Sequence, residues 1–123
     1  MISSGAGLWG SIRPNRRHDE VCPMTLERTR PLLFGAIADD LTGGSELAAM
    51  MGARGVPTGF STNVDADIAP HSLAHVIALK TRVCAPAQAV EQVLAAARKL
   101  LSAGCRQIFF KYCATFDSTP AGN

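Results

Sequence analysis

Short apolar runs alternate with longer helical patterns from residue 31 to the end of the chain. Uncharged or mostly apolar runs at 32–38, 56–62, 75–80 and 106–112 have the length and flanking residues typical of strands. Good helix formers fill 46–51, and Gly52 and Gly55 follow as helix-stop signals. Pro86 suits the first turn of a second helix, which Gly104 ends. That helix has apolar residues at helical spacing on one face: Val90, Val93, Leu94, Ala97, Leu100 and Leu101.

The order of these elements predicts the fold class. Strands that alternate with helices are joined by right-handed crossovers, which make neighbouring strands parallel and place helices on both faces of the sheet. The sequence therefore predicts a doubly wound α/β domain with a mainly parallel, partial Rossmann-like sheet across 31–123.

Residues 1–30 show no such periodicity and are rich in Gly, Ser, Arg and Pro, so we expect a disordered leader. The segment from Gly5 to Gly10 matches G-x-G-x-x-G, but only four residues precede it, too few for the strand that a dinucleotide site requires. No apolar run is long enough for a signal peptide or a membrane span. A cytoplasmic protein without a membrane partner is expected.

Composition and charge narrow the function classes. The chain is 47% hydrophobic and 18% charged, as in a globular domain. Its net charge of +2 comes from the leader, because residues 31–123 hold seven basic and seven acidic side chains. This balance gives no excess of basic residues of the kind that nucleic-acid-binding domains use to bind phosphates. The four cysteines show neither C-x-x-C spacing nor clustering with histidine, so we expect buried, reduced thiols and no zinc site: Cys22, Cys84, Cys105 and Cys113.

Polar residues follow three of the four predicted strands. Asp39 and Asp40 follow the first, Thr81 and Arg82 follow the third, and a polar loop begins at Lys111. Each group has an ordinary explanation as a helix cap, a surface residue or a turn. However, the carboxyl ends of parallel strands meet at one edge of a sheet, where ligands bind in open α/β folds. The coincidence of three groups there favours a binding site.

Three of these segments resemble a known family. ADDLTGGSELA at 38–48, ALKTR at 78–82 and FKYCATFDSTPAGN at 110–123 are similar, in order and spacing, to the N-terminal sugar-binding domain of the four-carbon acid sugar kinases. That family phosphorylates 3-oxo-tetronates, threonates and erythronates with ATP. The resemblance covers about residues 31–123 and departs where the family usually has Phe at Leu41 and Ala-Thr-Asp at 44–46.

The resemblance implies that 31–123 is part of a substrate domain whose ligand is a small sugar acid. It also implies ATP and Mg²⁺, with their site in a nucleotide-binding domain that this chain lacks. The chain alone is then expected to be inactive, with a separately encoded nucleotide-binding domain as a candidate partner. An unpaired edge on the last strand would favour self-association.

Such a site needs donors for an anion and an acceptor for the attacking hydroxyl. Arg82 and Lys111 can bind a carboxylate, and backbone N–H groups after Gly43 and Gly44 can assist. Asp39 and Asp40 can orient sugar hydroxyls, and Asp40 is the expected base, with Asp39 and Asp117 as alternatives. The remaining candidate substrate contacts are hydroxyl side chains and Asp117 itself: Thr42, Thr81, Thr115, Asp117, Ser118 and Thr119.

Two other interpretations stay open. A receiver domain also has an acidic pair that binds Mg²⁺ after its first strand, but it needs a phosphate-accepting Asp after the third, where this chain has Thr81 and Arg82. A catalytically inactive kinase remnant would share every motif named above.

Overall fold

The computed structural model describes residues 30–115 and 119–120. The predicted leader therefore lies almost wholly outside the described residues. The described chain contains four strands and two long helices; a helix-free connection joins the second and third strands, and a short 3-10 helix, η1, precedes the second long helix. Their bounds are β1 Phe34–Ala38, α1 Leu41–Ala53, β2 Thr58–Ser61, β3 Ala74–Ala78, η1 Thr81–Val83, α2 Pro86–Ser102 and β4 Gln107–Lys111.

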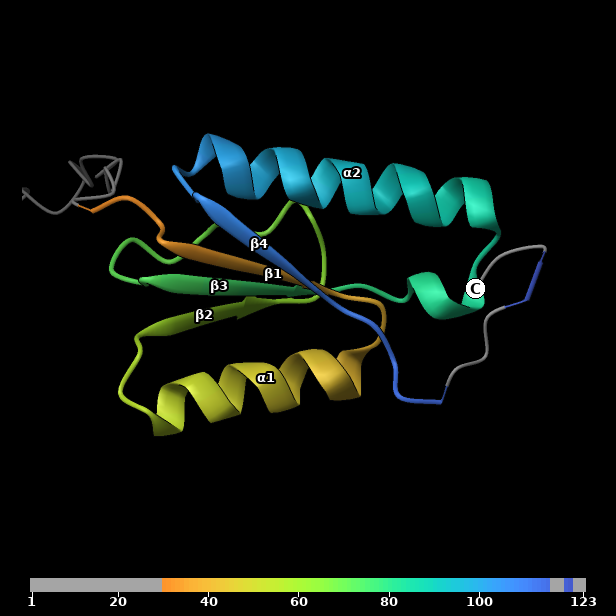
Figure 1. Ribbon diagram of the computed structural model, residues 1–123. Coiled ribbons are helices and arrows are strands. Elements are labelled where there is room, and N and C mark those ends of the chain that lie inside the picture. The colour runs from red at the N-terminus through yellow and green to blue at the C-terminus, as the bar shows by residue number, and fades with distance from the viewer. Residues whose placement is uncertain (1–29, 116–118, 121–123) are drawn as a thin grey trace, which may run out of the picture.

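The strands form one parallel sheet in the order β2-β3-β1-β4, with α1 on one face and α2 on the other (Figure 1). This arrangement confirms the predicted doubly wound α/β fold. The register places Ala38 opposite Ala78 of β3 and opposite Lys111 of β4. Three strands therefore end at the same level of the sheet.

The start of α1 differs from the prediction. Gly43 and Gly44 precede the predicted helix formers at 46–51, yet both are buried in the first turn of a helix that begins at Leu41. Asp40 is the N-cap residue, since its carboxylate accepts the Gly43 N–H at 2.6 Å and so satisfies a helix-end donor. Gly44 also lets α1 approach the sheet, because a Cβ there would lie 2.5 Å from the Ala78 Cβ. The local cap and this close packing outweigh the low helix propensity of the two glycines.

The main core lies between α2 and the sheet. Its buried members come from β1, β3, α2 and the adjoining loops: Leu32, Ile37, Ile77, Leu79, Ala96, Leu100 and Cys105. The predicted apolar face of α2 is only partly buried, because Val90, Leu94 and Leu101 are 59%, 47% and 56% exposed. Since β4 is the last strand of the sheet on this side, the described residues cover only the inner part of that face.

The prediction of buried thiols holds for Cys105 and is wrong for Cys84 and Cys113, which are half-buried. Cys84 directly follows η1 and Cys113 lies two residues beyond the end of β4, so neither is in the core and the neighbouring elements cover them only in part. Cys22 lies outside the described residues. No helix in the described part of the chain is long and apolar enough to cross a membrane.

Candidate functional site

Backbone hydrogen bonds tie together the carboxyl ends of β1, β3 and β4. The Leu79 N–H donates to the Ala38 carbonyl at 2.8 Å, and the Arg82 N–H donates to the Asp39 carbonyl at 3.2 Å. On the other side, the Asp39 N–H donates to the Lys111 carbonyl at 3.2 Å. Polar residues that follow three separate strands are thereby held close together, at the edge where the sequence placed them.

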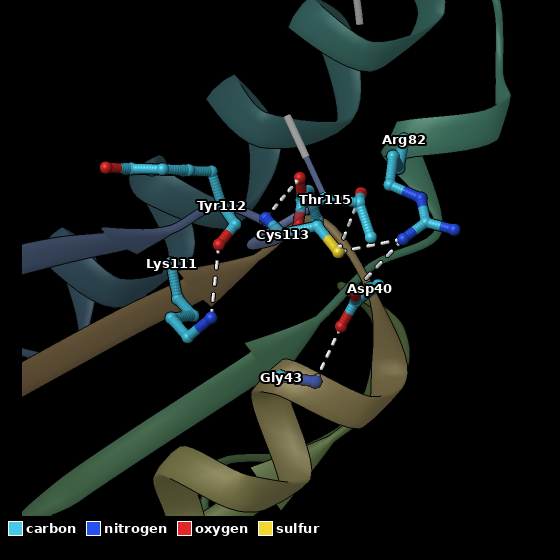
Figure 2. Close-up of polar contacts among 8 residues, drawn as sticks. Asp40, Gly43, Arg82, Lys111, Tyr112, Cys113 and Thr115 are labelled. Carbon is cyan, nitrogen blue, oxygen red and sulfur yellow. Dashed lines mark hydrogen bonds and ion pairs between the residues drawn. The ribbon is translucent and has the colours of Figure 1, made fainter. Parts of the chain in front are cut away.

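The side chains of Asp40, Arg82 and Cys113 form the centre of this edge. The Arg82 Nη1 lies 3.6 Å from the Asp40 Oδ2 and donates to the Cys113 Sγ at 2.8 Å (Figure 2). The Thr115 hydroxyl also donates to the Cys113 Sγ, at 3.3 Å. We call Asp40, Gly43, Arg82, Lys111 and Cys113 the rim cluster.

Asp39 and Asp40 are neighbours in sequence but have different environments. Asp39 is buried, with 2% of its surface exposed, and its Oδ2 accepts the Cys113 N–H at 3.0 Å. The Asp40 side chain is 22% exposed and faces the guanidinium of Arg82, which is 30% exposed. Asp39 thus fixes the loop after β4, whereas Asp40 is accessible to a ligand.

The pKa of Asp40 is lowered below its ordinary value of 3.8. The hydrogen bond from Cys113 contributes most, followed by the Gly43 N–H, and the charges of Arg82 and Lys111 act in the same direction. Partial burial opposes them. Asp40 is therefore ionised at neutral pH, which suits a hydrogen-bond acceptor better than a strong base.

Gly43 brings Lys111 close to the first turn of α1. A Cβ on Gly43 would lie 2.9 Å from the Asp40 Oδ1 and 3.3 Å from the Lys111 Nζ. The Lys111 ammonium itself donates to the Tyr112 carbonyl at 3.1 Å (Figure 2). The N–H groups of Gly43 and Gly44 themselves are paired, because Asp40 accepts the first through its side chain and the second through its carbonyl. Ligand binding by the N–H groups after Gly43 and Gly44 stays a prediction.

The other candidate residues are more scattered. Thr42 and Thr115 are exposed near the rim cluster, Thr119 is exposed, and Thr81 is buried within η1. Asp117 and Ser118 lie outside the described residues.

A hollow of about 390 Å³ adjoins the rim cluster on the α2 side. Asp39 and Thr81 form its polar part, and the other lining residues are apolar: Pro86, Ala89, Val90, Val93, Leu94 and Phe110. A charged ligand rich in hydroxyl groups would find more polar partners at the rim cluster than in this hollow.

The acidic residues that the structure describes do not form a magnesium site. Among residues 30–115 and 119–120, no group of three His, Cys, Asp or Glu side chains is arranged to hold a metal ion. The described contacts of Asp39 and Asp40 are with protein donors. A nucleotide-bound Mg²⁺ would need oxygen ligands from elsewhere.

Sequence reasoning missed Cys113. Its Sγ and N–H contact Arg82, Thr115 and Asp39, although it was expected to be an inert core thiol. Its position inside the FKYCATFDSTPAGN segment, two residues after Lys111, was the available signal.

Comparisons with known proteins identify the family of this chain. Residues 34–123 match the family described as the sugar-binding N-terminal domain. The 3-oxo-tetronate kinase of Burkholderia multivorans is 52% identical over 101 residues, which are 81% of this chain and 23% of that protein. The 3-oxo-tetronate kinase of Pseudomonas fluorescens is 50% identical over 103 residues, or 81% of this chain and 24% of that protein.

Solved structures show the same relationship. A crystal structure from Salmonella typhimurium superposes with a TM-score of 0.71 at 44% identity, covering 76% of this chain and 23% of that chain. A Haemophilus influenzae structure gives 0.66 at 40% identity, covering 72% and 22%. The chain thus spans about a quarter of the length of these relatives. By these matches, the chain belongs to the four-carbon acid sugar kinase family, within its sugar-binding N-terminal domain.

Proposed function

We propose that this chain is the substrate-binding portion of an ATP-dependent kinase for four-carbon sugar acids of the 3-oxo-tetronate, threonate or erythronate type. The observation that carries the proposal is the rim cluster, where Arg82 and Lys111 lie beside the ionised Asp40 at the carboxyl ends of parallel strands. The names of the relatives favour this substrate class over others.

Arg82 and Lys111 bind the carboxylate of the sugar acid in this proposal. The planar guanidinium can form two parallel hydrogen bonds with a carboxylate, and the ammonium adds a point charge. Thr42 and Thr115 are exposed near them and can contact the sugar hydroxyls. Asp117, Ser118 and Thr119 are proposed as further substrate contacts on sequence grounds alone.

Asp40 accepts a hydrogen bond from the hydroxyl that attacks the phosphoryl group. Its lowered pKa makes it a weak base. This weakness is tolerable because phosphoryl transfer depends more on positioning and charge stabilisation than on proton abstraction. Asp39 acts indirectly, since it is buried and holds the loop that carries Cys113.

ATP and Mg²⁺ enter this proposal through the kinase relatives, and their binding is assigned to a nucleotide-binding domain outside residues 31–123. Residues 31–123 are accordingly a partial sugar-binding domain. The receiver alternative gains no support, because none of the four residues at 79–82 that follow β3 is a phosphate-accepting Asp.

Binding calorimetry with 3-oxo-tetronate, threonate and erythronate tests the proposal. Loss of a charge-assisted hydrogen bond is expected to weaken binding by about ten- to a hundredfold in Arg82→Ala, and less in Lys111→Ala. Arg98→Ala removes an exposed Arg from α2 and is the matched control, with unchanged affinity expected. Wild-type affinity in both rim variants would refute the anion site, provided that their melting temperatures match that of the wild type.

A further inference from the structure

The sulfur of Cys113 occupies a central position in the rim cluster. It accepts hydrogen bonds from the Arg82 Nη1 at 2.8 Å and from the Thr115 hydroxyl at 3.3 Å. The backbone N–H of the same residue donates to the buried Asp39 Oδ2 at 3.0 Å. One residue therefore connects the cation of the site, a neighbouring hydroxyl and the end of β1 (Figure 2).

A thiol sulfur and a carboxylate differ in strength as hydrogen-bond acceptors for Arg82. A thiol sulfur is a weak acceptor, whereas a carboxylate forms short, charge-assisted hydrogen bonds of about 2.7–2.9 Å with guanidinium. The Arg82 Nη1 lies 3.6 Å from the Asp40 Oδ2, beyond that range, and makes its shorter contact with the sulfur. Arg82 thus makes one of its contacts with an acceptor that a carboxylate can outcompete.

We propose that Cys113 is a positioning residue for the sugar acid: its sulfur orients Arg82 through a weak contact that the substrate carboxylate replaces on binding. This inference rests on the proposed function. Cys113 is half-buried, so a ligand can reach the contact it replaces. A stronger acceptor at this position would compete with the substrate for Arg82. Loss of the sulfur would remove one of the contacts that order the long Arg82 side chain, so more of its ordering would have to occur on binding.

Three substitutions separate these effects. In Cys113→Ala, which removes the acceptor, threonate binding is expected to weaken by about five- to tenfold, the equivalent of one neutral hydrogen bond. Cys113→Ser restores an acceptor and should bind within about twofold of the wild type, since a hydroxyl also accepts and donates. Cys113→Asp should bind more weakly than Cys113→Ala, because its carboxylate forms an ion pair with Arg82 and repels the ligand.

A second readout does not depend on the ligand. The Asp40 carboxyl is titrated by carbon-13 NMR, and its pKa should rise towards 3.8 in Cys113→Ala and remain low in Cys113→Ser. Cys84→Ala removes another half-buried thiol and is expected to leave threonate affinity and the Asp40 pKa unchanged.

The affinity measurements distinguish failure of this inference from failure of the proposed function. Wild-type affinity in Cys113→Ala, or binding by Cys113→Asp as tight as that of Cys113→Ala, would overturn the exchange of sulfur for carboxylate. If the wild-type chain binds no tetronate, the proposed function fails and the exchange fails with it.

Discussion

Among single residues, Asp40 combines two roles, because it caps α1 and faces Arg82 across the rim cluster. Its pKa is depressed in the folded state, so its ionised form is stabilised by folding. This stabilisation is complete above the unfolded value of about 3.8 and is lost as the pH falls through the lower folded value. The stability advantage over Asp40→Asn should therefore be constant near neutral pH and shrink below pH 4.

Urea unfolding of the wild type and Asp40→Asn, at pH 7 and from pH 4 to pH 2, measures this difference. Asn caps helices about as well as Asp, so the comparison isolates the charge. A stability difference that does not change with pH would contradict the assigned environment of Asp40.

The residues of the candidate site were predictable to different degrees. Asp39, Asp40 and Arg82 follow the ends of strands and Lys111 is the last residue of one, so the parallel topology alone was enough to predict that they converge. The difference between the buried Asp39 and the accessible Asp40 was not predictable. The directions of two adjacent side chains after a strand depend on the groups that each one contacts in the folded chain. The contacts of Cys113 also depend on a loop geometry that has no period in the sequence.

For the elements, the close packing of α2 on β1 leads to a testable prediction. A Cβ on Gly35 would lie 2.9 Å from the Leu100 Cδ1 and 3.0 Å from the Cys105 Sγ, both buried. Gly35→Ala should destabilise the fold by about 1–3 kcal/mol, as overpacking in a core does.

Gly52→Ala is the matched control for this prediction. Gly52 lies in α1, with nothing within 4 Å of an added Cβ, so alanine there should stabilise the fold by about 0.5–1 kcal/mol. The urea unfolding midpoints of Gly35→Ala and Gly52→Ala, compared with that of the wild type, test both expectations. Equal effects of the two substitutions would show that α2 does not pack as closely as described.

Element type was more predictable than element limits. Strands and helices occur in the predicted order, but β1 begins at Phe34 rather than at residue 32, and α1 begins before its glycines. Those limits depend on the Asp40 cap and on sheet contacts that single-sequence periodicity does not encode. The partial exposure of α2 has a similar cause, because the pattern identifies an apolar face without showing how much of it the sheet covers.

For the whole molecule, the uncovered apolar surface of α2 and β4 predicts self-association. Val90, Leu94, Leu101 and Phe110 are exposed there, and β4 is an end strand of the described sheet. Sedimentation velocity should show association that rises with protein concentration and is reduced in Leu94→Lys. Met50→Lys introduces the same charge at an exposed position on α1 and should leave association unchanged. A monomer at all concentrations would contradict this prediction.

Catalysis is the other property of the whole molecule that can be tested. Phosphoryl transfer needs a cradle for the ATP phosphates and ligands that hold Mg²⁺ between the β- and γ-oxygens. The sequence contains no G-x-x-x-x-G-K-[ST] loop, and the described residues contain no cluster that could hold a metal ion. We therefore expect the 123-residue chain to bind threonate but not to phosphorylate it when incubated with Mg-ATP.

Addition of a polypeptide that matches the remaining three-quarters of the Burkholderia multivorans relative should restore turnover if the two parts assemble. The rate should then fall in Arg82→Ala and remain unchanged in Arg98→Ala, because only the former loses a proposed substrate contact. Turnover by the chain alone would show that residues assigned here to substrate binding also handle the nucleotide. In that case the assignment of substrate binding to this chain and of nucleotide binding to the added polypeptide would be wrong. The anion site tested by Arg82→Ala would still be supported.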